Sequence, residues 1–376
     1  MPEYDFLTSF FYLAKKISGR NLKLKKALEY LFLLLNFLVI LALLISYLAV
    51  YIPPDKFWVP SFFGLAFPFF VAANILFIVF WAILKPKYLL FSLISILIGW
   101  GFVNRYVQIS GKSTDKVGIR VVSYNVQNFA GKKLADQKVS ANKIQEFLNE
   151  KNADIICLQD VNLGNNKIFN VAKAAKNLKS IEHFHFSEKG ISTGKVTFTR
   201  YPIVKMGEIR YKKSYITAIC TDVLIGIDTV RIFNVHLQSY KIDPRKYEII
   251  DSPVIDEEKD LREIREIGGK LKRAFQIRAE QVREIQKLID KTHYPVIICG
   301  DFNDTPVSYT YQQMRGDLND AFIGSGKGFA RTYIGKLPSF RIDNILHSNI
   351  FKSYNFKVDN FRASDHLPVS CLLIKK

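Results

Sequence analysis

The chain has 376 residues and a formal net charge of +19 at pH 7, and 49% of its residues are hydrophobic. This length is enough for one large α/β domain with additional elements. The positive charge favours an anionic partner such as nucleic acid, phospholipid headgroups or a phosphorylated metabolite, although a well-solvated basic surface would account for it equally.

The cysteines exclude two ways of stabilising a fold. All four lie in apolar, strand-like segments, and their spacing fits neither a zinc site nor a disulfide framework. We therefore expect buried free thiols at Cys157, Cys220, Cys299 and Cys371.

Three apolar stretches come first along the chain. Residues 30–54 and 57–84 contain no charged residue, and each exceeds the ~20 residues that a helix needs to cross a bilayer. The third, residues 88–104, is shorter and reaches Ile109 only if Arg105 extends its side chain to the membrane interface. The first stretch is too long, and begins too far into the chain, for a cleaved signal peptide. These stretches predict a multi-pass integral membrane protein held in the lipid bilayer by its N-terminal helices.

The loop charges predict the orientation of these helices. Lysines and arginines precede the first stretch and separate the second from the third, whereas only Asp55 and Lys56 lie between the first and the second. The positive-inside rule then predicts a cytoplasmic basic segment at residues 1–27, three transmembrane helices within residues 28–110 and a polar linker at residues 111–118. With three spans the remaining chain lies outside the cytoplasm; if the third stretch does not cross, the remaining chain is cytoplasmic.

From Ile119 onwards, short β-type segments alternate with turns and a few helices. Helices are predicted over residues 139–150 and 167–176, and a long helix ends near Lys291. Ten strands with few helices predict an α/β fold of two packed mixed β-sheets flanked by helices, in a domain over residues 119–376. The predicted strands are residues 119–124, 154–159, 182–187, 195–199, 216–223, 229–235, 296–299, 341–347, 351–358 and 368–374.

Arg278 falls within the apolar stripe of the long helix. Its aliphatic part could pack while its guanidinium reaches water, or the cation could be directed across the sheet edge towards an acidic site. The second interpretation makes Arg278 a candidate substrate-binding residue.

Six short polar clusters each stand where a β-type segment ends. Carboxylates, carboxamides and imidazoles cost free energy when they are buried unpaired, so their recurrence at strand ends indicates convergence on a divalent cation and a phosphate. The clusters are Asn125, Gln159 with Asp160, His236, Asp301 with Asn303, Asp343, and Ser364 with Asp365 and His366.

Each cluster also has a simpler explanation. Asp301 and Asn303 project to one side after Gly300, and they would bind a hard cation or hold a nucleophilic water, or else close an Asx turn. Asp343 would orient an imidazole or pair with Arg341. His236 shares a strand face with Asn234, which would satisfy a buried histidine.

As an ordered set, these motifs resemble the endonuclease/exonuclease/phosphatase superfamily, which includes nucleases, sphingomyelinases and inositol polyphosphate phosphatases. The resemblance covers Ile119 to the C-terminus and implies a four-layered α/β sandwich that hydrolyses phosphate esters with Mg²⁺ or Mn²⁺. The motifs that carry it are Ser-Tyr-Asn125, Cys-Leu-Gln159-Asp160, Thr199-Arg-Tyr-Pro-Ile, Asn234-Val-His236-Leu, Gly-Asp301-Phe-Asn303, Arg341-Ile-Asp343 and Ser364-Asp365-His366.

The resemblance also implies a role for each site residue. Asn125, Asp160 and Asp365 would bind the metal, directly or through water. Asp301 and Asn303 would position the attacking water and the phosphoryl oxygens. His366, oriented by Asp343, would act as general base or transition-state contact, and His236 would bind another phosphoryl oxygen. The family usually has glutamate where this chain has Asp160, so we expect weaker metal affinity or a changed metal preference.

Together these inferences predict a membrane-anchored, nuclease-like phosphodiesterase with no obligate protein partner. The basic domain suits nucleic acid, for which phosphate neutralisation dominates affinity, whereas the membrane tether suits a phospholipid headgroup. An inositol phosphatase and a non-catalytic membrane receptor with the same fold are the further alternatives. The predicted catalytic residues are His236, Asp301, Asn303, Asp343 and His366, and the predicted substrate-binding residues are Arg278, Asn303 and His236.

Overall fold

The elements of the chain divide into two structural units. The computed structural model describes residues 22–131, 133–187, 193–211, 215–240, 257–335 and 340–376. One unit contains the chain up to Ser46 together with Ala66–Trp100, and the other contains Tyr47–Leu65 and Gly101–Lys376. Most of the predicted basic segment at residues 1–27 lies outside the described residues.

The first unit consists of apolar helices: α2 (Leu22–Leu48), α4 (Phe67–Leu84), the short turn η1 (Pro86–Tyr88) and α5 (Leu89–Ile98). Asn36 on α2 joins three of them, because it accepts a hydrogen bond from Trp81 Nε1 on α4 at 2.9 Å and donates one to Ser92 Oγ on α5 at 2.7 Å. Large apolar side chains elsewhere are exposed, such as Leu34 at 55% and Leu76 at 65%. Buried polar contacts combined with exposed apolar faces are typical of helices that pack within lipid.

Two helices of the described chain, Leu24–Leu48 and Phe67–Leu84, are long and apolar enough to cross a membrane. The structure does not have one long helix where the third span was predicted. The apolar helix Pro86–Ile98 is shorter than a membrane-spanning helix. It ends at Gly99, before the short helix α6 (Trp100–Val103). Arg105 does not extend to an interface, because it is buried in the second unit with 7% of its surface exposed. Length and composition therefore support two of the three predicted spans.

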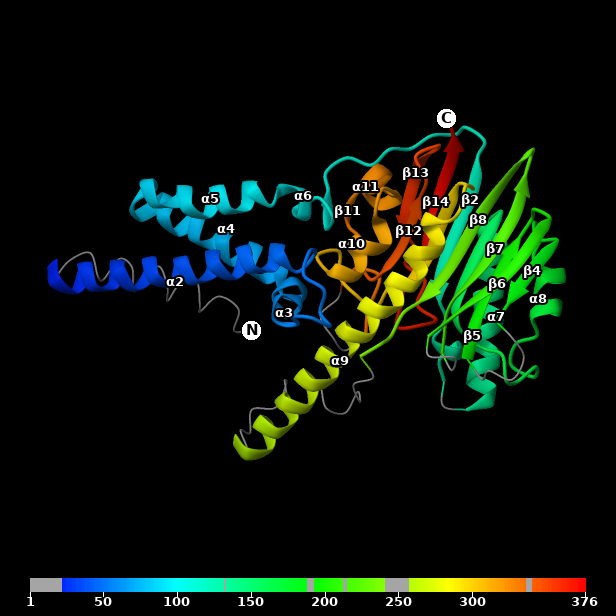
Figure 1. Cartoon of the computed structure of the whole chain (residues 1–376), viewed down its shortest axis with the longest axis horizontal. Coiled ribbons are helices and arrows are strands. Elements are labelled where there is room, and N and C mark those ends of the chain that lie inside the picture. Colours follow the sequence, from blue (N-terminus) through cyan, green and yellow to red (C-terminus); the bar gives the residue numbers. More distant parts are fainter. Residues whose placement is uncertain (1–21, 132, 188–192, 212–214, 241–256, 336–339) are drawn as a thin grey trace. The chain divides into compact units, whose positions relative to one another are not determined.

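The second unit is built on two six-stranded mixed sheets (Figure 1). The strands of the first sheet are β2 (Ile119–Asn125), β3 (Ile155–Asn162), β4 (His183–Phe186), β5 (Thr193–Thr199), β13 (Phe351–Val358) and β14 (Val369–Lys375). The strands of the second are β6 (Ile203–Tyr211), β7 (Tyr215–Ile225), β8 (Asp228–His236), β9 (Val296–Asp301), β10 (Asn319–Asp320) and β12 (Asp343–His347). Their orders are β13-β14-β2-β3-β5-β4 and β10-β12-β9-β8-β7-β6, and β1 (Val107–Gln108) pairs separately with β11 (Gly328–Phe329).

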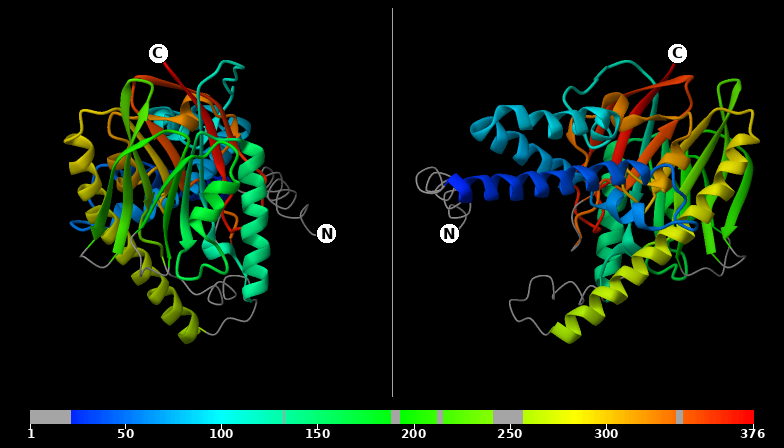
Figure 2. Two further views of the ribbon diagram at one scale, coloured as in Figure 1. Left: turned by 90° about the vertical axis from the view of Figure 1, so that its right-hand side faces the viewer. Right: turned by 60° about the vertical axis from the view of Figure 1, so that its left-hand side comes forward.

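Helices cover the outer face of each sheet. Apolar side chains of α7 (Leu134–Lys151) and α8 (Val171–Asn177) share a core with the first sheet, and those of α9 (Glu257–Asp290) and α10 (Tyr309–Arg315) share one with the second. In the left view of Figure 2, α9 and α7 lie on opposite sides of the sheets. The remaining helices of the described chain are α3 (Val59–Leu65), η2 (Gln127–Phe129) and α11 (Ala321–Ser325).

A third core fills the space between the sheets. Residues of both sheets, such as Val121 and Ile232, are buried there together with the thiols of Cys157, Cys299 and Cys371. The four layers confirm the predicted α/β sandwich. They also confirm buried free thiols at three positions, whereas Cys220 on β7 is only partly buried.

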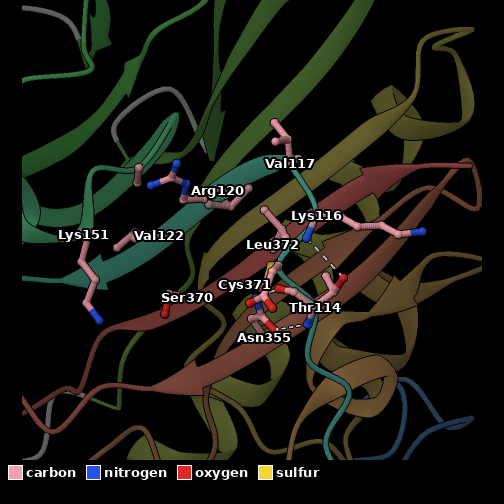
Figure 3. Close-up of a pocket in the computed structure, with 14 residues that line it drawn as sticks. Thr114, Lys116, Val117, Arg120, Val122, Lys151, Asn355, Ser370, Cys371 and Leu372 are labelled. Atoms are coloured by element: carbon pink, nitrogen blue, oxygen red, sulfur yellow. Dashed lines mark hydrogen bonds between the residues drawn. The ribbon is translucent and has the colours of Figure 1, made fainter.

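Four strands of the structure were not predicted: the longer strand β6 and the two-residue strands β1, β10 and β11. β6 was not predicted, because its sequence lacks regular alternation and four successive residues are exposed. Residues 111–118 are attached to the first sheet: Thr114 N donates to Asn355 Oδ1 at 2.9 Å, and Asn355 Nδ2 donates to Thr114 O at 2.8 Å (Figure 3). The same segment lines a pocket with Arg120 and Lys151, towards the opposite end of β2 from Asn125 (Figure 3).

Gly300 allows the central strands β8 and β9 to approach closely just before the candidate site. A Cβ atom at this position would lie 1.9 Å from Val235 O on β8, and the φ angle of +146° is one that other residues rarely adopt. Glycine is therefore required where β9 delivers Asp301.

Replacing Gly300 by alanine is expected to destabilise the protein by about 3 kcal/mol or more, because both the clash and the backbone strain oppose the native strand pairing. Gly226→Ala is the matched control, since its φ is +65° but no atom lies within 4 Å of the added Cβ. The control should cost only about 1 kcal/mol. Thermal unfolding of both purified variants measures the difference, and equal losses would contradict the close-approach requirement.

Candidate active site

The strand ends bring the predicted clusters together at one edge of the two sheets. β2 and β3 are parallel neighbours in which Asn125 pairs with Gln159, and β8 and β9 are parallel neighbours in which His236 pairs with Asp301. Asp343 begins the antiparallel strand β12 directly opposite Asp301. A hydrogen bond of 3.0 Å from Asn125 Nδ2 to Asp301 Oδ2 joins the two sheets at this edge.

Asp301 is the centre of this cluster. Its carboxylate is 1% exposed and accepts hydrogen bonds from the backbone N of Asn303 at 2.7 Å and from Asn303 Nδ2 at 3.0 Å. Its Oδ2 also lies 3.6 Å from His236 Nε2 and 3.7 Å from His366 Nε2. Burial raises the pKa of Asp301 to about 7, although His366 opposes this increase. A carboxylate with such a pKa exchanges its proton near neutral pH.

His366 is held by Asp343. Asp343 Oδ2 lies 2.9 Å from His366 Nδ1, and both side chains are buried. Burial alone would lower the pKa of His366, but the carboxylates of Asp343 and Asp301 raise it to about 10. The alternative partner of Asp343 is not used: Arg341 Nη1 donates instead to Asp320 Oδ2 at 2.8 Å.

His236 and Asn303 complete the polar face around Asp301. Burial lowers the pKa of His236 well below its usual range, with the nearby cations Lys195 and His366 adding to the effect. The pKa values of the two imidazoles are therefore shifted in opposite directions. Asn303 has a φ of +51°, and its Nδ2 also donates to Leu237 O at 3.1 Å, which fixes the turn after β9.

The predicted metal ligands lie at the same edge. Asn125 Oδ1 accepts a hydrogen bond from the backbone N of Gln127 at 3.0 Å. Burial raises the pKa of both Asp160 and Asp365, and the charge of Asp365 further raises that of Asp160. Carboxylates whose charged forms are disfavoured in this way are stabilised by a nearby cation, and carboxylate and amide oxygens are the donors that Mg²⁺ prefers. These side chains therefore fit a hard divalent cation.

A second group of possible ligands overlaps with the histidine cluster. Asp301, Asp343 and His366 offer ligand atoms within 4.8 Å of one another. Two of these residues already bond each other through Asp343 Oδ2, while Asp343 Oδ1 has no hydrogen-bond partner among the described residues. This arrangement is better suited to orienting an imidazole than to surrounding an ion.

Sequence reasoning missed Lys195. Leu158 pairs with Val196 and Val161 with Gly194, so the two residues Gln159 and Asp160 oppose the single residue Lys195 on β5. Asp160 has a φ of +54° in this β-bulge. Lys195 is 3% exposed; burial lowers its pKa to about 8, and Asp160 opposes this shift. The signal was a lysine between Gly194 and Val196 in an otherwise uncharged strand, which alternation alone interprets as a surface position.

Gln159 and Asn234 connect the two sheets through hydrogen bonds. Gln159 Nε2 donates to Asn234 Oδ1 at 2.8 Å, and Asn234 Nδ2 donates to Val196 O at 2.9 Å. These bonds direct Asn234 towards the first sheet. The hydrogen bonds of Asn234 to Gln159, Leu158 and Val196 therefore do not favour the simpler explanation of His236 as a histidine satisfied by Asn234.

Arg278 occupies a different position from the one expected. Its side chain is fully buried on α9, where Nε donates to Asp304 Oδ2 at 3.1 Å and Nη1 donates to Gln238 O at 2.8 Å. The guanidinium does not reach water, in contrast to the simpler expectation. Because no part of it is exposed, these contacts favour positioning of the loop after Asn303 over the predicted contact with substrate.

Replacing Asp343 by asparagine is expected to lower the pKa of His366, because the carboxylate that most strongly raises it is removed. We expect any hydrolytic rate to fall by up to ~10²–10³, the usual contribution of one donor directed at a developing negative charge. Titration of isotope-labelled histidines by NMR measures the pKa directly. Asp359→Asn, which alters a buried carboxylate paired with Lys151, is the control, and an unchanged His366 pKa in Asp343→Asn would contradict the assignment.

Comparisons with known proteins agree with this geometry. A profile of the endonuclease/exonuclease/phosphatase family matches residues 122–366, and a profile described as a domain of unknown function (DUF8431) matches residues 29–106. No curated protein sequence matches the chain.

Several solved structures with very different sequences are similar to this chain. A humanized TDP2 from D. rerio is 14% identical with a TM-score of 0.51, and the match covers 68% of this chain and 99% of that chain. An endonuclease/exonuclease/phosphatase family protein from Bacteroides thetaiotaomicron is 18% identical with a TM-score of 0.49, covering 69% and 96%. The 3′ phosphatase NExo from Neisseria, bound to a product DNA hairpin, is 18% identical with a TM-score of 0.48, covering 68% and 99%. Because the family profile spans more than half of the chain, the chain belongs to the endonuclease/exonuclease/phosphatase family.

Proposed function

We propose that this protein is a membrane-anchored phosphodiesterase that uses a divalent metal ion. The observation that carries the proposal is the chain of contacts from Asp343 through His366 to Asp301, whose carboxylate also lies 3.6 Å from His236 Nε2. A purely binding descendant of the fold has no need for a buried carboxylate that holds a histidine in one orientation. This argues against the non-catalytic receptor.

Asp301, His366 and His236 have different roles in the proposed hydrolysis. Asp301, with a pKa near 7, accepts the proton of the attacking water as the new P–O bond forms. His366, protonated at neutral pH, donates to a phosphoryl oxygen and stabilises the negative charge that develops there, while His236 contacts a second oxygen. The ester P–O bond breaks on the far side of phosphorus, and the leaving oxygen takes a proton from solvent.

Asn125, Asp160 and Asp365 are the residues that would hold the metal. When bound, Mg²⁺ or Mn²⁺ supplies Lewis-acid neutralisation of the phosphate charge. Lys195 lies opposite Asp160 and adds positive charge to this side of the site, although burial lowers its pKa to about 8. The positive charge of Lys195 offsets part of the negative charge of Asp160. We therefore expect it to weaken metal binding, as does the shorter side chain of aspartate.

The position of residues 47–65 bears on membrane topology. This segment connects α2 to α4, yet it belongs to the same unit as the catalytic residues. If α2 spans the bilayer, its C-terminal end and the whole catalytic unit lie on the side opposite the N-terminus. This conclusion does not depend on whether α5 crosses fully, in contrast to the expectation from loop charges alone. The basic N-terminal segment then places the catalytic unit outside the cytoplasm.

The phosphodiester substrate is either a nucleic acid or a phospholipid headgroup. The net positive charge favours nucleic acid, and the proposed anchor favours lipid. An extracytoplasmic domain has no access to genomic DNA, so a role in DNA repair is excluded under this topology. Nucleic acid from outside the cell and lipid headgroups remain as the two substrate classes to be compared.

Activity of the full-length protein in detergent or nanodiscs tests the proposed function. We expect Mg²⁺- or Mn²⁺-dependent turnover of bis-p-nitrophenyl phosphate that falls by ~10²–10³ in His366→Ala, because one donor to the developing charge is lost. His293→Ala, at an exposed histidine before β9, is the control. Asp160→Glu should lower the metal concentration needed for half-maximal rate. Turnover that survives both His366→Ala and chelation would reject the mechanism.

The natural substrate class is determined in the same preparation. Supercoiled plasmid, single-stranded RNA, sphingomyelin and inositol phosphates are offered separately, and each rate is compared between the wild type and His366→Ala. A nuclease cleaves the first two, whereas a headgroup phosphodiesterase cleaves only the third.

Topology is measured with single cysteines and a membrane-impermeant maleimide on sealed vesicles. Lys56→Cys, in the segment between α2 and α4, and Ile227→Cys, at a 95% exposed turn of the catalytic unit, should be labelled from the same, extracytoplasmic side. Lys87→Cys in η1 should be labelled only from the other side. Labelling of Lys56→Cys and Ile227→Cys from opposite faces would refute the topology.

A further inference from the structure

Two segments that adjoin the apolar helices belong to the catalytic unit. We call residues 47–65, between α2 and α4, the anchor loop, and residues 101–106, after α5, the exit segment. Both fall within the region matched by the domain of unknown function, residues 29–106. Their contacts indicate what this part of that domain does.

The anchor loop is attached to α9. Both carboxylate oxygens of Asp55 accept hydrogen bonds from Arg283, at 3.0 and 2.9 Å. The ring of Phe62 packs edge-on against Phe275 with centroids 5.3 Å apart, and the ammonium of Lys272 lies 4.9 Å from the ring centre of Trp58. These contacts hold the part of α9 that carries Arg278.

The anchor loop and the exit segment also hold the chain that follows the catalytic turn. A Cβ atom on Gly64 would lie 2.4 Å from Val307 O, so the two backbones are in close contact there. Arg105 of the exit segment is 7% exposed and donates from Nη1 to Pro306 O at 2.9 Å and from Nη2 to Gln312 Oε1 at 2.8 Å.

This held segment continues directly from Asp301 and Asn303. Asp304 is 3% exposed, and its Oδ2 accepts hydrogen bonds from Arg278 Nε at 3.1 Å and from Thr310 Oγ1 at 2.7 Å. Residues 304–312 are therefore fixed by α9 and by the exit segment together. A displacement of this segment moves the turn that positions Asp301, and misplacement by about 1 Å can cost ~10²-fold in rate.

We infer that the anchor loop and the exit segment position the catalytic turn, so that the membrane-adjacent region of unknown function is a working part of the active site. Arg105 is the main positioning residue, and Gly64 and Asp55 act with it. The inference rests on the proposed phosphodiesterase function for its kinetic readout but not for its structural one.

The test compares variants of the full-length protein in nanodiscs. Arg105→Met removes both hydrogen bonds, and Gly64→Ala pushes on Val307, whereas Arg105→Lys keeps the charge and one donor. Arg120→Met, at an exposed arginine towards the other end of β2, is the control. We expect kcat for bis-p-nitrophenyl phosphate to fall ~10–100-fold in the first two variants, with KM changed less than twofold. Arg105→Lys should recover part of the rate, and the control should match the wild type.

Hydrogen–deuterium exchange of residues 301–312 in the same samples separates the two proposals. Faster exchange there in Arg105→Met and Gly64→Ala, at a temperature where unfolding of both is absent, is the expected result. If the wild type shows no turnover but the exchange changes as expected, the proposed function fails and the positioning role stands. Folded Arg105→Met and Gly64→Ala variants with wild-type kcat and wild-type exchange would overturn the inference.

Discussion

The burial of one carboxylate, that of Asp301, organises the rest of the structure. A carboxylate with 1% exposure costs free energy unless hydrogen bonds and positive charge surround it. Here the donors come from both sheets, because Asn125 belongs to the first sheet and Asn303 follows a strand of the second. The need to satisfy Asp301 therefore fixes how the two sheet edges meet. The imidazoles of His236 and His366 lie 3.6 and 3.7 Å from the same carboxylate oxygen.

The sequence predicted the four layers and most strands of the catalytic unit, because each strand has its own local pattern. It also predicted which polar residues gather at the site, since Asn125 and Asp301 stand where β-type segments end, whereas Asp343 begins a strand. Lys195 was missed because it lies inside a strand, and only the bulge at Asp160 on the neighbouring strand turns it into a site residue. Strand pairing of this kind depends on residues far apart in the chain, and local patterns carry no information about it.

The region between the first two apolar helices also has long-range contacts that local sequence patterns do not predict. The sequence analysis used Asp55 and Lys56 only as loop charges that indicate membrane orientation. In the structure, Asp55 forms a bidentate ion pair with Arg283, more than two hundred residues away in sequence. Arg105 was expected at a membrane interface and is instead buried against the loop after the catalytic turn. In both cases a charged residue next to an apolar helix was interpreted by a rule for membrane proteins. Its hydrogen-bond partner, however, lies in the α/β sandwich.

The two buried arginines near the catalytic turn differ in a way that bears on their roles. Arg278 faces the carboxylate of Asp304, which raises the pKa of its guanidinium although burial opposes this. Arg105 donates to two neutral oxygens, and burial lowers its pKa. A buried cation with neutral acceptors is the less stable arrangement, so Arg105 contributes little to folding compared with an apolar side chain of the same volume. What it does contribute is a two-point attachment of residues 306 and 312 to the chain that follows the apolar helix α5. That geometric role, more than stability, accounts for an arginine at this position.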